Sequence, residues 1–293
     1  MKALWAIDPF HQNAATIQNM HQLMRHLTQS DQNVELGYVV THRPSELAAP
    51  QTAPFEKEFE PGPLEILQHK LEEADVQMPP GHVHIISNPT LSVTAVVDSL
   101  LRLARNQKAD VVALYTQARE GLVNKLLGSF AETAMHRSRM DLLLMNPHSE
   151  FSGRIQKVAF AYDFQKTSNK HFFRAIEYCQ NWKAHLIVIH AAEIIYRTSL
   201  DESNPEIQKY RQSIDRKKEW IENQCRERGI TFDIVIESQF ESISEAILKE
   251  CQKREADLIV IGTKSGKHSP LMGGSVARQI VRTSQIPTLV LRS

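Results

Sequence analysis

The chain has 293 residues, 42% of them hydrophobic, and its 34 basic residues balance its 34 acidic residues. This length and hydrophobic content predict two globular domains. The zero net charge argues against a dedicated nucleic-acid-binding protein, which usually carries a basic excess. No apolar run reaches about eighteen residues, so we expect no transmembrane helix. Residues 1–10 predict a first β-strand and not a signal peptide.

Cysteines and histidines are the candidates for redox or metal chemistry. Cys179, Cys225 and Cys251 are odd in number and form no CxxC motif. They predict buried thiols in a reducing cytoplasm, with a redox role as the less favoured alternative. His82 and His84 alternate along one predicted strand, with no Cys, Asp or Glu at ligand spacing beside them. We therefore interpret them as strand-end residues near solvent and expect no metal.

An internal repeat organises the chain. The recurring pairs, in the same order in both halves, are "KALWAIDPF" (2–10) with "KVAFAYDFQ" (157–165), "ADVVALYTQ" (109–117) with "ADLIVIGTK" (256–264), and 128–146 with 274–292. Asp8 thereby falls on Asp163. The repeat predicts two copies of one domain, 1–147 and 153–293, joined by the polar linker 146–154.

Each copy predicts the same alternation of strands and helices. In the first copy we expect strands at 2–7, 34–40, 82–87, 109–115 and 141–145 and helices at 13–29, 63–74, 91–106 and 128–138. In the second copy we expect strands at 157–162, 184–191, 231–237, 256–262 and 287–292 and helices at 168–182, 205–228, 242–254 and 274–284. This alternation predicts an α/β fold: two tandem Rossmann-like domains, each with a five-stranded parallel sheet and helices on both faces.

The loop "GTKSGKHSPLMGGS" at 262–275 connects a predicted strand to a predicted helix. Its early glycines, Gly262 and Gly266, can adopt positive φ and let the backbone approach a ligand closely. The helix start that follows favours an anion, and Lys264 and Lys267 add positive charge. Gly-rich turns and Gly–Ser helix starts also occur where nothing binds.

Two further residues belong to the same predicted edge of the sheet. Asp163 ends the first strand of the second copy and Ala191 ends the second strand. Ligands of open parallel sheets bind outside the carboxyl ends of the strands. A carboxylate at Asp163 suits a ribose hydroxyl or a metal that bridges phosphates.

The order G-x2-G-x9-G-[S/T], ahead of a final helix and strand and with an Asp after the first strand, resembles the universal stress protein family. The ending "VARQIVRTSQIPTLVLR" (276–292) is similar to that family's ending, and both copies share the resemblance. It implies tandem domains of adenine nucleotide alpha hydrolase-like fold, which pair through their last strands and can dimerise. It also implies a cytoplasmic stress-response protein that binds ATP, or a related adenine nucleotide, with Mg²⁺. The nucleotide-binding residues that it implies are Asp163, Ala191, Gly262, Ser265, Gly266, Gly274, Ser275 and Val276.

Both copies depart from the family's loop pattern. In the second copy, Ser265 stands where the second glycine is expected, and eight residues instead of nine separate it from Gly274. In the first copy, Tyr115 and Ala118 replace the two early glycines. A tyrosine would occupy the space that a phosphate or ribose needs, so we interpret the first copy as an empty partner domain.

Three functions stay open on the sequence alone. The first is nucleotide binding that modulates contacts with protein partners. The second is a nucleotide-free interaction or scaffold protein, which the shortened loop favours. The third is an ATP-dependent enzyme, but HIGH, SGGxDS, GxxxxGK[ST] and GxSxG are all absent, so no catalytic residue is predicted and slow ATP hydrolysis is the most we expect. The long connection 41–62 also offers room for a lipid or another apolar ligand.

Overall fold

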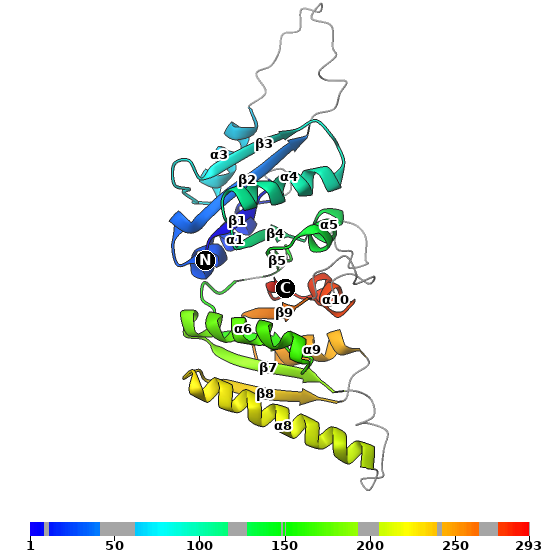
Figure 1. The fold of residues 1–293 in the computed structure, drawn as a ribbon. Helices are drawn as coiled ribbons and strands as arrows, with labels where there is room; N and C mark the ends of the chain where they lie inside the picture. Colours follow the sequence, from blue (N-terminus) through cyan, green and yellow to red (C-terminus); the bar gives the residue numbers. More distant parts are fainter. Residues whose placement is uncertain are drawn as a thin grey trace, which may run out of the picture. The chain divides into compact units, whose positions relative to one another are not determined.

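The computed structural model consists of two compact units, Met1–Gly153 and Arg154–Ser293. It describes residues 1–8, 12–41, 62–116, 128–147, 149, 151–192, 205–238, 242–263 and 275–292. Each unit has its own parallel sheet flanked by helices (Figure 1). The connection considered above for an apolar ligand lies, apart from its two end residues, outside the described residues.

The first unit contains five parallel strands in the order β3-β2-β1-β4-β5. The strands are β1 (Ala3–Ala6), β2 (Val34–Thr41), β3 (Val83–Asn88), β4 (Val111–Tyr115) and β5 (Asp141–Met145). The helices are α1 (Ala14–Thr28), the short 3-10 helix η1 (Asp31–Asn33), α3 (Pro63–Glu73), α4 (Val93–Asn106) and α5 (Ser129–Arg137).

The second unit repeats this arrangement, with its parallel strands in the order β10-β9-β6-β7-β8. The strands are β6 (Lys157–Ala161), β7 (His185–Ala191), β8 (Phe232–Glu237), β9 (Leu258–Gly262) and β10 (Thr288–Leu291). The helices are η2 (Lys166–Ser168), α6 (Asn169–Trp182), α8 (Pro205–Glu227), α9 (Ile243–Lys253) and α10 (Ser275–Thr283). The predicted fold class is confirmed in both units.

The helices of the second unit cover two different faces of its sheet. From the central strand β6 the chain moves through β7 to β8 at one edge of the sheet. It then crosses to β9 on the other side of β6 and continues to β10, in the opposite direction. Because β-α-β crossovers are right-handed, α6 and α8 lie on one face and α9 and α10 on the other. Contacts agree: the ring of Phe172 on α6 lies 5.3 Å from that of Trp220 on α8, and α9 packs against α10.

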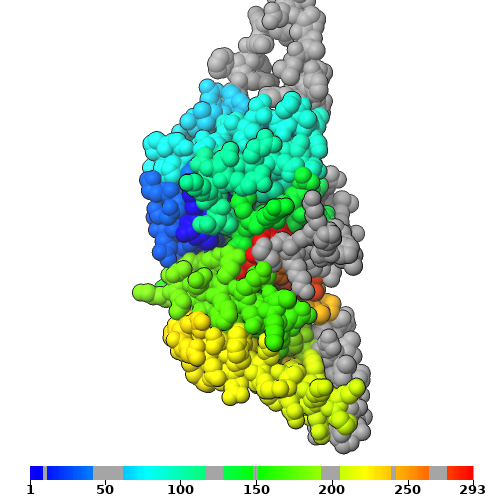
Figure 2. Space-filling view, viewed as in Figure 1, coloured from blue at the N-terminus to red at the C-terminus, as the bar shows by residue number. Residues whose placement is uncertain are grey.

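Burial on both faces explains why the central strands are apolar throughout. Every residue of β5 is buried, as are the first four of β9. Helix α8 lies at the surface of its unit (yellow in Figure 2), and only one of its faces is buried. That face contains Ile207, Ile214, Ile221 and Cys225, as its period of three and four residues predicts. None of the described helices combines the length and apolarity that crossing a membrane requires.

The three cysteines are buried and form no disulfide. Burial raises the pKa of Cys179, Cys225 and Cys251 to about 12. Because the thiolate is the reactive form of cysteine, these thiols are poor nucleophiles at neutral pH.

The two histidines that we placed near solvent are half-buried instead, and both face a buried carboxylate. Nε2 of His84 lies 2.8 Å from Oε2 of Glu35, and Nδ1 of His82 lies 3.8 Å from Oε1. Nζ of Lys2 lies 2.8 Å from Oε1 of the same carboxylate. Burial raises the pKa of Glu35, but hydrogen bonds from Lys2 and His84 outweigh burial and lower it. The alternation along the strand placed both histidines on one face. The carboxylate of Glu35 could not be predicted there, because it comes from β2, which pairs with β3.

Candidate functional site

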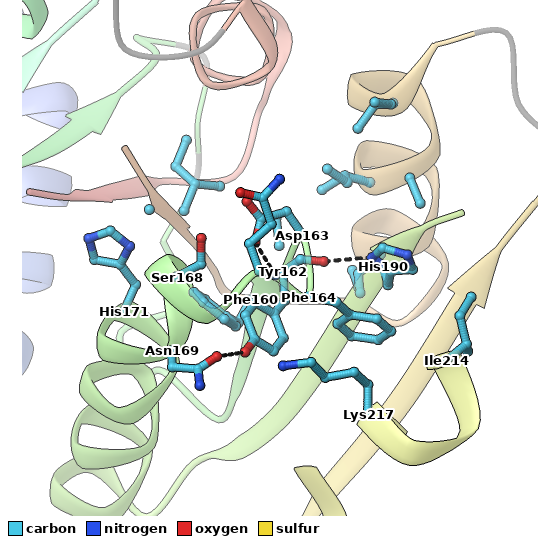
Figure 3. Close-up of a pocket in the computed structure, with 18 of the residues that line it drawn as sticks. Phe160, Tyr162, Asp163, Phe164, Ser168, Asn169, His171, His190, Ile214 and Lys217 are labelled. Atoms are coloured by element: carbon cyan, nitrogen blue, oxygen red, sulfur yellow. Dashed lines mark hydrogen bonds between the residues drawn. The ribbon is translucent and has the colours of Figure 1, made fainter. Parts of the chain in front are cut away.

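The second unit contains a cavity of about 950 Å³ at the carboxyl ends of β6, β7 and β9 (Figure 3). This is the edge of the sheet where open α/β folds bind ligands. The volume lies near the upper end of the range of about 300–1,000 Å³ for small-molecule sites. The cavity therefore has room for a nucleotide.

The predicted site residues within the described part of the chain meet at this cavity. Those that line it are Asp163, Ala191, Gly262 and Val276. Ser275 is the first residue of α10, so the start of this helix borders the cavity. The remaining predicted residues, Ser265, Gly266 and Gly274, and the two loop lysines, Lys264 and Lys267, lie outside the described residues. The binding role of all eight predicted residues stays a prediction.

Asp163 is exposed at the cavity, immediately beyond β6. Its Oδ1 accepts a hydrogen bond from the backbone N–H of Gln165 at 3.0 Å, which forms a turn of the type that Asp favours. This bond fixes the side chain and leaves Oδ2 for further acceptance. The carboxylate is therefore positioned to accept hydrogen bonds from ligand hydroxyl groups.

The residue after Asp163 has an unusual backbone conformation. Phe164 has a φ of 60°, which is costly for a bulky side chain. Its ring stacks on that of His190 with 3.9 Å between centroids and 8° between planes. Nδ1 of His190 lies 2.8 Å from the carbonyl oxygen of Tyr162, which is consistent with a hydrogen bond that the ring N–H donates. Stacking and this hydrogen bond hold the turn in place, and strained backbone of this kind is common at ligand sites.

Gly262 does not use the positive φ that glycine permits: the described glycines with positive φ are Gly81, Gly153 and Gly229. The structure gives another reason for glycine at this position. A Cβ on Gly262 would lie only 2.3 Å from Nδ1 of His171, whose ring on α6 is buried. Glycine is therefore needed to make room for this histidine.

In the first unit, the large side chain comes from the strand and the small one from the helix, the reverse of the second unit. Gly262 aligns with Tyr115, and His171 aligns with Thr16. The buried Tyr115 hydroxyl donates a hydrogen bond of 2.6 Å to the carbonyl oxygen of Thr16. Tyr115 also lines a cavity of only about 170 Å³, which contains Asp8. The first unit thus keeps the carboxylate, and the tyrosine side chain stands where the second unit has a glycine.

Sequence reasoning missed the contribution of α8 to the cavity of the second unit. The lining residues from this helix are Tyr210, Ser213, Ile214, Arg216, Lys217 and Trp220. A signal was present: Lys217 follows Ile214 by three residues, so a cation interrupts the buried face of the helix. Among the described residues, the charged side chains that line the cavity are those of Asp163, Lys166, Arg216 and Lys217, an excess of positive charge that suits an anion.

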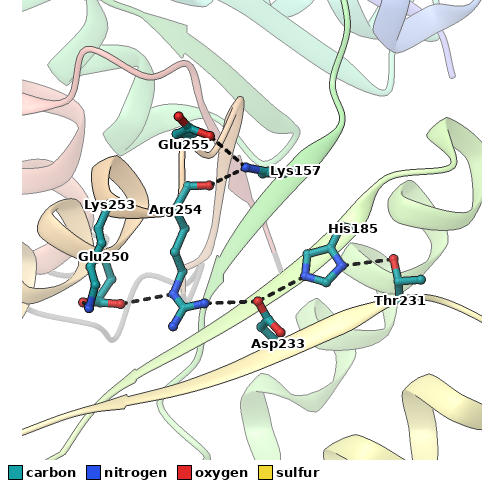
Figure 4. A network of polar contacts seen from close by, with 8 residues as sticks. All are labelled: Lys157, His185, Thr231, Asp233, Glu250, Lys253, Arg254 and Glu255. Atoms are coloured by element: carbon teal, nitrogen blue, oxygen red, sulfur yellow. Dashed lines mark hydrogen bonds and ion pairs between the residues drawn. The ribbon is translucent and has the colours of Figure 1, made fainter.

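A second polar cluster lies at the opposite, amino-terminal end of these strands (Figure 4). Glu250 on α9 is buried and accepts hydrogen bonds of 3.2 Å from Lys253 and from Arg254. Arg254 also donates to Asp233 on β8 at 3.1 Å. Burial raises the pKa of Glu250, but the two cations outweigh burial and lower it. The bond between Arg254 and Asp233 anchors the end of α9 to the sheet. Because the charges of this cluster neutralise one another, it is a poor candidate for a ligand site.

Comparison with known proteins supports the resemblance of the second unit to the universal stress protein family. The model of the Universal stress protein family matches residues 154–292. No curated protein matches the chain in sequence. A structure of a universal stress protein from Archaeoglobus fulgidus DSM 4304 is 17% identical, with a TM-score of 0.63 over 99% of this chain and 98% of that one. A functionally unknown protein from Pseudomonas aeruginosa PAO1 is also 17% identical, with a TM-score of 0.64 over 100% of this chain and 92% of that one. At these identities the structural matches show a shared two-domain fold.

Proposed function

Residues 154–292 belong to the universal stress protein family, and on this premise we propose that the second unit binds ATP or a related adenine nucleotide. The observation that carries the proposal is the meeting of Asp163, Gly262 and the start of α10 at one cavity. Occupancy would favour one conformation of the protein and thereby modulate contacts with protein partners in a cytoplasmic stress response.

Each part of the nucleotide finds a suitable group in this arrangement. The carboxylate of Asp163 is placed to accept hydrogen bonds from ribose hydroxyl groups. The free N–H groups and the dipole at the start of α10 favour the phosphates. Ile243, Ile247 and Ile261 give the cavity an apolar wall for the base. Mg²⁺ would bind through the phosphates, as it commonly does when few protein carboxylates are available.

The test is calorimetric titration of the full chain with ATP and Mg²⁺. Asp163→Asn should weaken ATP binding about three- to tenfold, because a charged acceptor is replaced by a neutral one. Asparagine can still accept the bond from Gln165, so the turn should survive. The matched control is Asp8→Asn, at the aligned position beside the small cavity of the first unit, which should leave ATP binding unchanged. No binding at millimolar ATP, or equal effects of the two substitutions, would contradict the proposal.

The alternative is an interaction protein that works without nucleotide. The loop that is one residue shorter than the family pattern favours it, as does the Tyr115 side chain that occupies the site of the first unit. Mass spectrometry of small molecules released from the purified protein separates the two functions, since copurifying adenine nucleotide supports the first and contradicts the second.

A further inference from the structure

Aromatic side chains gather on one side of the large cavity. Phe160 near the end of β6 and Tyr162 just beyond it are two residues apart, so both face the layer of α6 and α8. Tyr162 stacks on Phe172 of α6 with 5.4 Å between centroids, and Phe160 lies 6.1 Å from the same ring. Asp163 extends away from this group (Figure 3). The cavity therefore has an aromatic side, next to α6 and α8, and a second side that contains Asp163 and the start of α10.

Lys217 of α8 places its ammonium group on the aromatic side (Figure 3). Nζ lies 5.2 Å from the centroid of Trp220 and 6.0 Å from that of Tyr162, within range of cation–π attraction. No carboxylate in the described parts of the chain lies within ion-pair distance of this nitrogen. Burial lowers the pKa of Lys217 and the charge of Lys166 lowers it further, while Asp163 opposes them. An anion beside Lys217 would therefore relieve an unfavourable electrostatic environment.

The polar and apolar groups around Lys217 suit an anion with an aromatic body. Asn169 is held by a hydrogen bond that the Tyr162 hydroxyl donates to its Oδ1, so its amide N–H group is oriented as a donor. Ile214 and the ring of Trp220 supply apolar surface beside the cation. The residues that would hold a nucleotide lie on the other side of the cavity.

We propose that the aromatic side, formed by Tyr162, Asn169, Lys217 and Trp220, is a second ligand subsite that binds a small organic anion. Lys217 makes the ionic contact with a phosphate or carboxylate group, and the rings pack against the body of the ligand. This function goes beyond the proposed nucleotide binding and does not require it, because none of these four residues is assigned to the nucleotide.

Calorimetric titration of the full chain with phenyl phosphate, and separately with benzoate, tests this subsite and distinguishes the two anionic groups. At least one of these probes should bind, and its affinity should persist when ATP is saturating. Lys217→Met should weaken binding about ten- to a hundredfold, since a charge-assisted contact is lost. Lys217→Arg should retain most of it. The matched control, Lys209→Met, removes the same charge from an exposed position of α8 and should change nothing.

Three results would overturn the proposal: no binding of either probe at millimolar concentration, equal affinity of the Lys217→Met and parent proteins, or complete displacement of the probe by ATP. The last result would place the probe in the nucleotide subsite. The two proposals remain separable. If phenyl phosphate binds and ATP does not, the nucleotide function fails and this subsite stands. If only ATP binds, the reverse holds. Circular dichroism of each variant shows that a loss of binding is not a loss of fold.

Discussion

Replacing Gly262 with alanine should destabilise the second unit by about 1–3 kcal/mol, the usual cost of overpacking a core. The new Cβ would lie 2.3 Å from Nδ1 and 2.7 Å from Cγ of His171. The imidazole must move, yet His171 is only 3% exposed. Gly262 has no positive φ, so alanine imposes no backbone strain and the whole cost arises from this one side-chain contact.

A double-mutant cycle with His171→Ala isolates that contact. Unfolding in guanidinium, followed by hydrogen exchange of peptides from α6 and β9, reports the free energy of unfolding of the second unit alone. Alanine at 262 should cost less in the His171→Ala background than in the parent, because the truncated histidine leaves room for the methyl group. If the two costs add, or if Gly262→Ala costs less than about 0.5 kcal/mol, the packing argument is refuted.

Two further predictions concern stability. Because the pKa of Glu35 and of Glu250 is lowered in the fold from an ordinary value of 4.5, the stability that they contribute should be complete above that value and be lost as pH falls through the folded pKa. Denaturation titrations from about pH 6 to about pH 3 check this expectation. Glu250→Gln should reduce the pH dependence of the stability of the second unit. A free energy of unfolding that stays constant over this range would contradict it. Tyr115→Phe should cost about 1 kcal/mol in the first unit because its hydrogen bond to Thr16 is lost. Hydrogen exchange of peptides from β4 and α1 measures this cost, and an unchanged protection there would show that the bond contributes nothing.

Local patterns in the sequence were sufficient to predict the fold class. The repeat aligned Asp8 with Asp163 and predicted the same strand and helix order twice, which the structure shows. The apolar run at β9 and the period of α8 depend only on which residues are near in sequence, so both could be predicted. The order of the strands in each sheet could not be predicted in this way, because the same alternation with right-handed connections occurs in sheets of different strand order.

Contacts between distant segments could not be predicted in the same way. Glycine at 262 suggested backbone freedom, whereas packing against His171, from another element, is the reason that the structure gives. The sequence pattern suggested exposure of His82 and His84, whereas both are half-buried and lie beside the buried carboxylate of Glu35 on the neighbouring strand.

The sequence by itself determined that the chain has two α/β units that repeat the same pattern. It also placed Asp163, Ala191 and the start of α10 at one edge of a sheet, because the carboxyl ends of parallel strands meet at the same edge. Tertiary structure alone decided the shape of the cavity at that edge. In the second unit Gly262 lies beside His171, whereas in the first unit Tyr115 reaches Thr16, and this difference affects the volume of each cavity. The packing of α8 over β8 brings Lys217 to the aromatic rings. These outcomes depend on side-chain volume and on helix packing across the sheet, which no periodicity along the chain encodes.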